Sequence, residues 1–336
     1  MKGGRGVGRR RVLAILGAAA GLPLLPGGSA APMWCWQGDA LGAAARILLV
    51  LRDGERARAL AESCVAELRR LEAALSLYRA DSELSRLNRD GRIELPSRDL
   101  LAAMRAAQTW SEITGGAFDA TVQPLWRLYA DHFARRSADA NGPPEAALAE
   151  ALSRVDYRAV EISSRRIAFA RPGMAVTLNG IAQGYITDRI VDRLRNDGID
   201  NTLVEMGETA ALGRRGDGAP WTAGVHNAAG RIAMALPLND RAIATSAGFA
   251  TPFERSGRFH HLFAPASGEC AAHLRAVSVL APSATAADAL STAAFVAPFA
   301  HLPALLRTAA AAGPIEAIVQ SRDGSFLRLT AGVQAA

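Results

Sequence analysis

Six short segments of strand character follow one another between residues 202 and 280, and they restrict the fold more than any other feature of the chain. They lie at residues 202–205, 221–226, 231–236, 242–246, 258–263 and 275–280. Helical patterns flank this run but do not alternate with it, which excludes a regular β-α-β order. The chain therefore predicts an α+β fold, a two-lobed single domain with mixed, largely antiparallel sheets and packed helices.

The amino-terminal half contributes most of the predicted helices. Apolar residues three and four apart indicate helices over residues 55–75, 98–113 and 145–152, with a shorter helix from about residue 82. The predicted strands of this half lie at 46–52, 159–162, 166–170 and 174–178, after a loose segment at 34–36. The strand at 174–178 runs into a helix to about 196, and the chain ends with a helix near 301–312 and a hairpin over 315–329.

The charge of the chain is concentrated at its start. The sequence has 336 residues, 50% of them hydrophobic, which is enough for one large domain. The formal net charge is +6, but residues 1–30 contain five basic residues and no acid, which leaves 33 basic and 32 acidic residues in the remainder. This near-neutral remainder predicts no nucleic-acid partner.

The first 31 residues have the pattern of an export signal. A basic start precedes an apolar run from Val12 to Leu25, and small residues follow at 27–31. The arginines at 9–11, placed before Val12 and Leu13, fit a twin-arginine signal, with an ordinary Sec signal or an uncleaved anchor as the alternative. We therefore expect a signal at residues 1–31, one domain at 32–330 and a periplasmic location.

An apolar helix near the carboxyl end carries Asp288 and Thr292 one turn apart, so both face the same way. A buried carboxylate among alanine and leucine needs hydrogen-bond donors or a cation to compensate it. A hard metal ion held by oxygen ligands is one such partner. The alternative is that Asp288 faces solvent near the start of the helix, which Ser283 or Thr285 would cap.

Two glycine-containing connections are candidate ligand sites. Residues 178–184 read as a strand-to-helix turn whose free N–H groups suit an anion such as a phosphate, although a tight structural turn is the alternative. Residues 114–125 place Phe118 and Asp119 beside a glycine pair. This second connection suits either a bound planar ring or a loop anchored by a buried phenylalanine.

Two adjacent histidines, His260 and His261, lie on the strand predicted over 258–263. Successive side chains of a strand point to opposite faces, so only one of the two can line a given site. A structural role for both is the alternative to a catalytic role for one.

Together these segments resemble the ApbE family of flavin transferases. The motifs occur in family order at residues 77–88, 115–125, 178–185 with Asp188, 244–247, His261 with Pro265 and Gly268, and 281–284 with 288–292. The resemblance covers essentially everything after the signal. It implies a periplasmic FAD:protein FMN transferase, which cleaves FAD between its phosphates, releases AMP and attaches FMN by a phosphoester to a threonine or serine of a partner.

The resemblance also implies roles for individual residues. A magnesium ion is implied at Asp288, Thr292 and the backbone carbonyl of Gly180, an oxygen donor set that suits a cation bridging the phosphates of the substrate FAD. His261 is implied as the base that deprotonates the acceptor hydroxyl. The implied flavin contacts are Leu41, Gly42, Ala43, Tyr78, Ala117, Phe118, Asp119, Gln183 and the backbone at Leu262.

The chain departs from the usual family pattern at the flavin side of this site. Gln183 stands where the family has lysine, Ala264 where it has an acid, and residues 41–43 read Leu-Gly-Ala in place of Met-Gly-Thr. Asn179 and Gln183, together with the twin-arginine signal, resemble the NosX branch, which implies an exported flavoprotein acceptor of the membrane-bound NosR type. Two alternatives stay open: an FAD-binding carrier without transfer chemistry, and an FAD pyrophosphatase that releases FMN and AMP.

Overall fold

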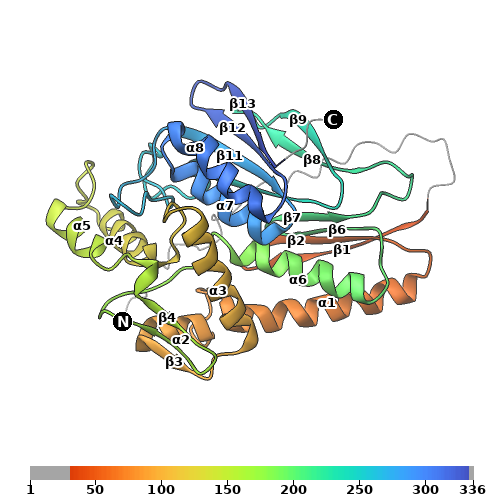
Figure 1. The fold of residues 1–336 in the computed structure, drawn as a ribbon, viewed down its shortest axis with the longest axis horizontal. Helices are drawn as coiled ribbons and strands as arrows, with labels where there is room; N and C mark the ends of the chain where they lie inside the picture. Colours follow the sequence, from red (N-terminus) through yellow and green to blue (C-terminus); the bar gives the residue numbers. More distant parts are fainter. Residues whose placement is uncertain (1–30, 333–336) are drawn as a thin grey trace, which may run out of the picture.

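An eight-stranded sheet forms the centre of the fold, in the computed structural model that describes residues 31–332 of the chain (Figure 1). The strand order is β1-β2-β6-β7-β10-β11-β12-β13, and every pairing between these strands is antiparallel. Their bounds are β1 (Met33–Ala40), β2 (Ala43–Val50), β6 (Thr202–Met206), β7 (Thr209–Leu212), β10 (Ala242–Ala247), β11 (Leu274–Ala281), β12 (Ile315–Ser321) and β13 (Phe326–Ala331). The α+β class is confirmed, while the predicted signal lies almost entirely outside the described residues.

Both faces of this sheet are covered, which explains why its central strands are buried along nearly their whole length. One face packs against the helices α1 (Gly54–Leu75), α6 (Ala182–Asn196) and α7 (Ala284–Val296), with α3 (Arg98–Ile113) and α8 (Leu302–Ala309) alongside them (Figure 1). The other face packs against the hairpin of β8 (Trp221–His226) and β9 (Ile232–Leu238). Along each strand, alternate residues therefore belong to the two cores, as Ile47 and Leu48 do.

A smaller three-stranded sheet, in the order β3-β5-β4, lies at one end of the molecule. It contains β3 (Arg92–Glu94), β4 (Val160–Ile162) and β5 (Arg166–Phe169), and it is accompanied by α2 (Glu83–Asp90), α4 (Gln123–Phe133) and α5 (Glu145–Leu152). Short 3-10 helices complete the description: η1 (Ala120–Val122), η2 (Tyr157–Ala159), η3 (Gly248–Ala250), η4 (Phe299–His301) and η5 (Ala310–Ala312). No helix within residues 31–332 has both the length and the apolar character needed to cross a bilayer.

Two predicted strands are wrong. Residues 174–178 are buried but form no strand, because the side chain of Asn88 takes the place of a neighbouring strand: its Oδ1 accepts from Val176 N and its Nδ2 donates to Val176 O, both at 2.7 Å. Residues 258–263 make only isolated bridges, one of them between Pro252 and His260. The segment expected to be loose at 34–36 belongs instead to the edge strand β1.

Candidate functional site

The start of α7 is held by α6, which fixes where Asp288 lies. Ser283 caps the helix by accepting from Ala286 N at 3.2 Å, as one sequence alternative proposed. Asp188 of α6 accepts from the first backbone N–H groups of α7, those of Ala284 at 2.7 Å and Thr285 at 2.8 Å. One turn later Asp288 is only 4% exposed, so the solvent-facing alternative is wrong.

The carboxylate of Asp288 is buried with little to compensate its charge. The one hydrogen bond that it accepts from the described residues comes from Gly184 N, at 3.0 Å to Oδ2. Burial raises the pKa of Asp288 to about 7, against the lowering effect of the Gly184 N–H, and the charge of Asp188 adds to the rise. A buried carboxylate in such surroundings gains strongly from a bound cation.

A second buried carboxyl group, Glu208, lies near Asp288 and was not predicted. It is 6% exposed and follows Gly207 in the connection between β6 and β7. Burial raises the pKa of Glu208 well above its ordinary value, and the charge of Asp288 raises it further. Sequence reasoning missed it because a glycine and an acid between two strands read as an ordinary polar turn.

Gly180 lies directly against the other members of the predicted metal set. A Cβ atom added there would be 2.9 Å from Oγ1 of Thr292 and 3.3 Å from the ring of Phe118. Only glycine lets the backbone of this turn come so close to the hydroxyl. The structure thus brings Gly180, Thr292 and Phe118 together, with Asp288 one helical turn from Thr292.

A chain of hydroxyl groups sets the direction of the Thr292 hydroxyl. Ser291 Oγ donates to the carbonyl of Asp288 at 3.0 Å, so it must accept from Ser246 Oγ, which lies 2.8 Å away. Because Ser246 Oγ donates its only proton to Ser291, its contact with Thr292 Oγ1, at 3.3 Å, is one in which Ser246 accepts. The lone pairs of Thr292 therefore stay free for a cation. Ser246 belongs to the motif at residues 244–247, and the motif alone indicates no role for its hydroxyl.

The predicted flavin contacts at residues 41–43 form a two-residue hairpin turn between β1 and β2. Leu41 and Gly42 both have positive φ, 47° and 83°, as this kind of turn requires. The carboxylate of Glu72, near the end of α1, accepts from Leu41 N at 2.8 Å. This contact ties the turn to the end of α1, just before Tyr78.

Tyr78 lies beside the glycine turn of the candidate site. Tyr78 is 63% exposed, and the side chain of Asn179, the neighbour of Gly180, lies close enough to its hydroxyl to lower the pKa that burial raises. The backbone of Tyr78 is held by Ser76, whose hydroxyl accepts from Tyr78 N at 3.1 Å. An exposed aromatic ring next to the proposed phosphate site is available to stack on a planar ligand.

The connection at 114–125 is held by its own side chains. Phe118 is buried, as the anchor alternative expected, and its N–H donates to Thr114 Oγ1 at 3.1 Å. The carboxylate of Asp119 accepts from Thr121 N at 2.7 Å and from Tyr157 N at 3.1 Å. Ala117, just before them, is half-buried, so a flavin can meet its backbone while the Asp119 carboxylate holds the loop.

Gln183 and Leu262 are both buried at this site. The amide of Gln183 packs on Gly207, where any added Cβ would overlap it, so the side chain faces the connection that carries Glu208. The backbone of Leu262 is already engaged: its N–H donates to His260 Nδ1 at 3.3 Å and its carbonyl accepts from Ala271 N at 3.0 Å. A ligand contact at Leu262 is therefore limited to the second lone pair of its carbonyl and to its side chain.

The two histidines are distinguished by their hydrogen bonds. His260 Nε2 lies 2.8 Å from the carbonyl of Ala271, so Nε2 carries the proton and Nδ1 accepts from Leu262 N. His260 is thus fully occupied, and its ring packs 5.8 Å from that of Phe295 in α7. His261 Nδ1, in contrast, is buried without a hydrogen-bond partner among the described residues.

The imidazole of His261 is neutral at ordinary pH. Burial lowers its pKa to about 4, and the adjacent His260 lowers it further. β10 and the residue after it lie between the histidine pair and α7: Ser246 of β10 contacts Thr292, and Gly248, the first residue of η3, packs on the His260 ring. No hydrogen bond within residues 31–332 joins His261 directly to Asp288 or Thr292.

The site offers hard oxygen donors. Among residues 31–332 no group of three or more His, Cys, Asp or Glu side chains is arranged to hold a metal. The donors here are one carboxylate, one hydroxyl and one backbone carbonyl, which match the preference of Mg²⁺ for a few protein oxygens plus substrate phosphates. The uncompensated carboxylate, the oriented Thr292 hydroxyl and the close approach of Gly180 all fit such an ion.

Comparisons with known proteins place the chain in one family. The sequence model of the ApbE family matches residues 41–319. An FAD:protein FMN transferase of Treponema pallidum is 32% identical over 279 residues, covering 76% of each chain, and one of Haemophilus influenzae is 30% identical over 247 residues, covering 70% of this chain and 71% of the relative.

Solved structures are similar over almost their whole length. The flavinyl transferase ApbE of Pseudomonas stutzeri, in its apo form, has a TM-score of 0.76 at 28% identity, covering 90% of this chain and 98% of that structure. The flavin transferase ApbE of Vibrio cholerae has a TM-score of 0.75 at 26% identity, covering 89% and 97%.

Proposed function

The chain belongs to the ApbE family and is an FAD:protein FMN transferase, and from this premise we propose that it joins FMN to a serine or threonine hydroxyl of an exported flavoprotein with the help of Mg²⁺. In this reaction the acceptor oxygen bonds to the phosphorus on the riboflavin side of FAD. The bond between that phosphorus and the bridging oxygen breaks, and AMP leaves with the bridging oxygen.

Asp288, Thr292 and the carbonyl of Gly180 would hold the magnesium ion. The observation that carries this proposal is the contact of Gly180 with Thr292, one turn from a buried carboxylate that no cation among the described residues compensates. A bound Mg²⁺ would neutralise charge on the FAD pyrophosphate. The hydroxyl chain through Ser246 and Ser291 would leave the Thr292 lone pairs free to bind the ion.

His261 would take the proton of the acceptor hydroxyl at Nδ1. That nitrogen has no partner among the described residues, and the lowered pKa keeps the ring neutral and able to accept a proton. On the flavin side, the turn at 41–43, Tyr78 and the backbone of residues 117–119 would position the ring system. Gln183 and the backbone at Leu262 would border the same pocket without adding a charge.

The twin-arginine pattern at the start of the chain supports a periplasmic site of action. The acceptor is then an exported domain, and the likeness of the 178–184 turn to the NosX branch favours a membrane-bound flavoprotein of the NosR type. This part of the proposal is tested by the location of the native protein in fractionated cells of its source, which should release it with the periplasmic contents.

The transfer is tested by incubating the chain with FAD, Mg²⁺ and an acceptor domain that carries the target threonine. We expect a covalently fluorescent acceptor on a denaturing gel and AMP in equal amount. Replacement His261→Ala should lower adduct formation by a factor of about 10²–10⁴, the usual contribution of a general base, while FAD still binds. His301→Ala, which changes an exposed histidine, is the matched control and should leave transfer unchanged.

The same experiment separates the two alternative activities. AMP and free FMN without an adduct would show a pyrophosphatase, and bound FAD that stays intact with Mg²⁺ would show a carrier. The buried, uncharged Gln183 is the feature that makes these outcomes worth measuring, because the family carries a lysine there.

A further inference from the structure

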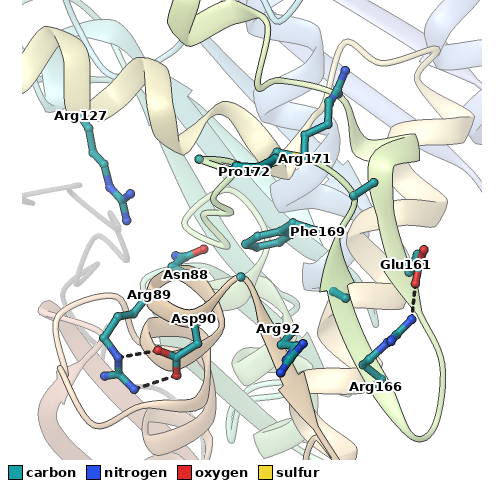
Figure 2. Close-up of a pocket in the computed structure, with 15 residues that line it drawn as sticks. Asn88, Arg89, Asp90, Arg92, Arg127, Glu161, Arg166, Phe169, Arg171 and Pro172 are labelled. Carbon is teal, nitrogen blue, oxygen red and sulfur yellow. Dashed lines mark hydrogen bonds and ion pairs between the residues drawn. The ribbon is translucent and has the colours of Figure 1, made fainter.

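An arginine-lined groove lies outside the candidate site, between the small sheet and α4. It encloses about 690 Å³ and is walled by the end of α2, by β3, by β5 with the residues that follow it, and by Arg127 of α4 (Figure 2). We call it the arginine groove, after Arg89, Arg92, Arg127, Arg166 and Arg171. No residue assigned to FAD or to the metal lines it.

The arginine groove has a net positive charge. Five arginines line it against two carboxylates, those of Asp90 and Glu161, which leaves three positive charges. Arg89 is neutralised by Asp90 through contacts of 2.8 and 2.9 Å, and Arg166 by Glu161 at 2.7 Å. Arg171 turns away from the groove in Figure 2 and pairs with Asp156 at 3.2 Å.

Two arginines of the groove, Arg92 and Arg127, have no acidic partner among residues 31–332. They come from different walls, Arg92 from β3 and Arg127 from α4, and Figure 2 shows the Arg127 side chain directed toward the end of α2 that carries Arg89. Like charges gathered around a recess without counter-charges raise the local potential and attract an anionic ligand.

The shape of the groove favours a polypeptide over a small anion. Its volume far exceeds that of one inorganic anion, and the free guanidinium groups sit on separate walls rather than converging on one point (Figure 2). Carboxylates spaced along a peptide meet separated arginines through individual charge-assisted hydrogen bonds. Phe169, which lies among these arginines, offers an apolar surface for the aliphatic part of such a peptide.

The groove lies within a short distance of the candidate site. Asn88, on its wall, is hydrogen-bonded to Val176, and Gly180 lies four positions after Val176, a span of at most about 14 Å. Arg127 lies in the second turn of α4, and α4 follows directly on η1 and on Phe118 and Asp119, which precede it in the chain. About four or five extended residues of an acceptor, at about 3.3 Å each, can therefore span this distance.

We propose that the arginine groove docks an acidic segment of the acceptor protein and so holds the target hydroxyl near the FAD phosphates. The proposal rests on the proposed transfer function for the identity of the partner. The docking itself is a binding event, and it can be measured without any transfer.

The test uses the full chain and a fluorescein-labelled peptide that carries three aspartates within six residues of one threonine. Fluorescence anisotropy should show binding of this peptide but at least tenfold weaker binding of the same peptide with asparagines. The double variant Arg92→Glu, Arg127→Glu should weaken binding of the aspartate peptide at least about tenfold, since two attractions become repulsions. The milder pair Arg92→Gln, Arg127→Gln should lie between.

The matched control is Arg105→Glu, Arg307→Glu, which changes the net charge equally at two exposed helix positions. It should change peptide binding less than twofold, and all variants should bind FAD as the unchanged chain does. Equal binding of the two peptides, unchanged binding in the groove variants, or full displacement by inorganic phosphate at constant ionic strength would overturn the proposal. Loss of FMN transfer alone, with these binding results intact, would instead count against the proposed function.

Discussion

At the scale of single residues, the burial of Asp288 lowers the stability of the cation-free protein at neutral and higher pH, and the same burial favours binding of a cation. The pKa of its carboxyl is raised to about 7 in the folded chain, above the ordinary value of 3.8. Between these two pH values the folded protein holds a proton that the unfolded chain has lost. The contribution of Asp288 to stability is therefore full below about pH 4 and is lost as pH rises through 7.

Replacement Asp288→Asn should accordingly stabilise the cation-free protein at pH 8 and abolish binding of Mg²⁺. Each kcal/mol recovered should raise the melting temperature by about 2–4 °C in a chain of this size. Thermal unfolding at pH 8 with and without Mg²⁺ measures both effects: the unchanged chain should gain stability from the ion, and the variant should not. A variant that melts lower and still responds to Mg²⁺ would contradict the assignment.

The pH dependence of cation binding follows from the same carboxyl group. Only the ionised form of Asp288 binds Mg²⁺, so the apparent Kd should rise as pH falls through the raised pKa of this carboxyl, by up to about tenfold for each pH unit. The pKa of His261 is lowered to about 4, so this ring should add no step between pH 5 and 9. Calorimetric titration with Mg²⁺ from pH 5 to 9 provides the measurement, and an affinity independent of pH would be the contrary outcome.

Ser246 should control cation affinity without being a ligand. Ser246→Ala removes the acceptor of the Thr292 proton, so that the hydroxyl can turn its hydrogen toward the cation; the expected loss is about 1 kcal/mol, or five- to tenfold in Kd. Ser278→Ala is the matched control, because this buried serine of β11 bonds to Thr245, the neighbour of Ser246 in β10, at 2.8 Å and has no hydrogen bond to Thr292. Equal effects of the two substitutions on Mn²⁺ binding would mean that the hydroxyl chain has no orienting role.

At the scale of elements, the close crossing of α6 and α7 places the site. Gly184 lies so near the start of α7 that an added Cβ would overlap the carbonyl of Ala284, and its own N–H donates to Asp288. Gly184→Ala should therefore cost about 1–3 kcal/mol of unfolding free energy through overpacking and weaken cation binding as well. Gly54→Ala, in the first turn of α1 with nothing within 4 Å of the new methyl group, should be neutral or slightly stabilising. Urea unfolding of both variants measures the difference, and equal stabilities would refute the tight crossing.

The helices were the part of the fold most open to prediction. The pattern over 98–113 and 145–152 coincides with α3 and α5, because the apolar periodicity of a helix is a local property of the chain. Strands depend on partners that are distant in the sequence, so a local pattern predicts them less well than it predicts helices. Residues 174–178 are apolar like a strand, but Asn88 fills the neighbouring position, and β1 was missed because an edge strand with alternating exposure lacks a continuous apolar run.

The residues of the candidate site that belong to sequence motifs could be predicted. Those that reach the site only through tertiary packing could not. The proximity of Asp288, Thr292 and Gly180 was an expectation from the resemblance, and the structure shows Gly180 against Thr292, one helical turn after Asp288. Glu208 and the pairing of Ser246 with Ser291 depend on how β7 and β10 lie against α6 and α7, which no local pattern encodes. The same holds for His260, whose structural role is visible only from its bond to Ala271.

At the scale of the whole molecule, the large sheet and the small sheet position different candidate sites. The large sheet and its helices hold Asp288, the hydroxyl chain and the two histidines. Residues of the small sheet, α2 and α4 line the arginine groove (Figure 2). The segment 174–180 runs from one part to the other, clamped by Asn88 in its middle and ending at the glycine turn. We therefore expect substrate FAD and acceptor protein to be bound by different parts of the fold and to meet at Gly180.

The most direct test of the central claim is the position of a bound cation. Crystals grown with FAD and Mn²⁺, in place of Mg²⁺, should give an anomalous diffraction peak about 2.0–2.3 Å from a carboxylate oxygen of Asp288, from Thr292 Oγ1 and from the carbonyl oxygen of Gly180, with phosphate oxygens completing its coordination. A peak elsewhere, or a peak that survives Asp288→Asn, would contradict the account.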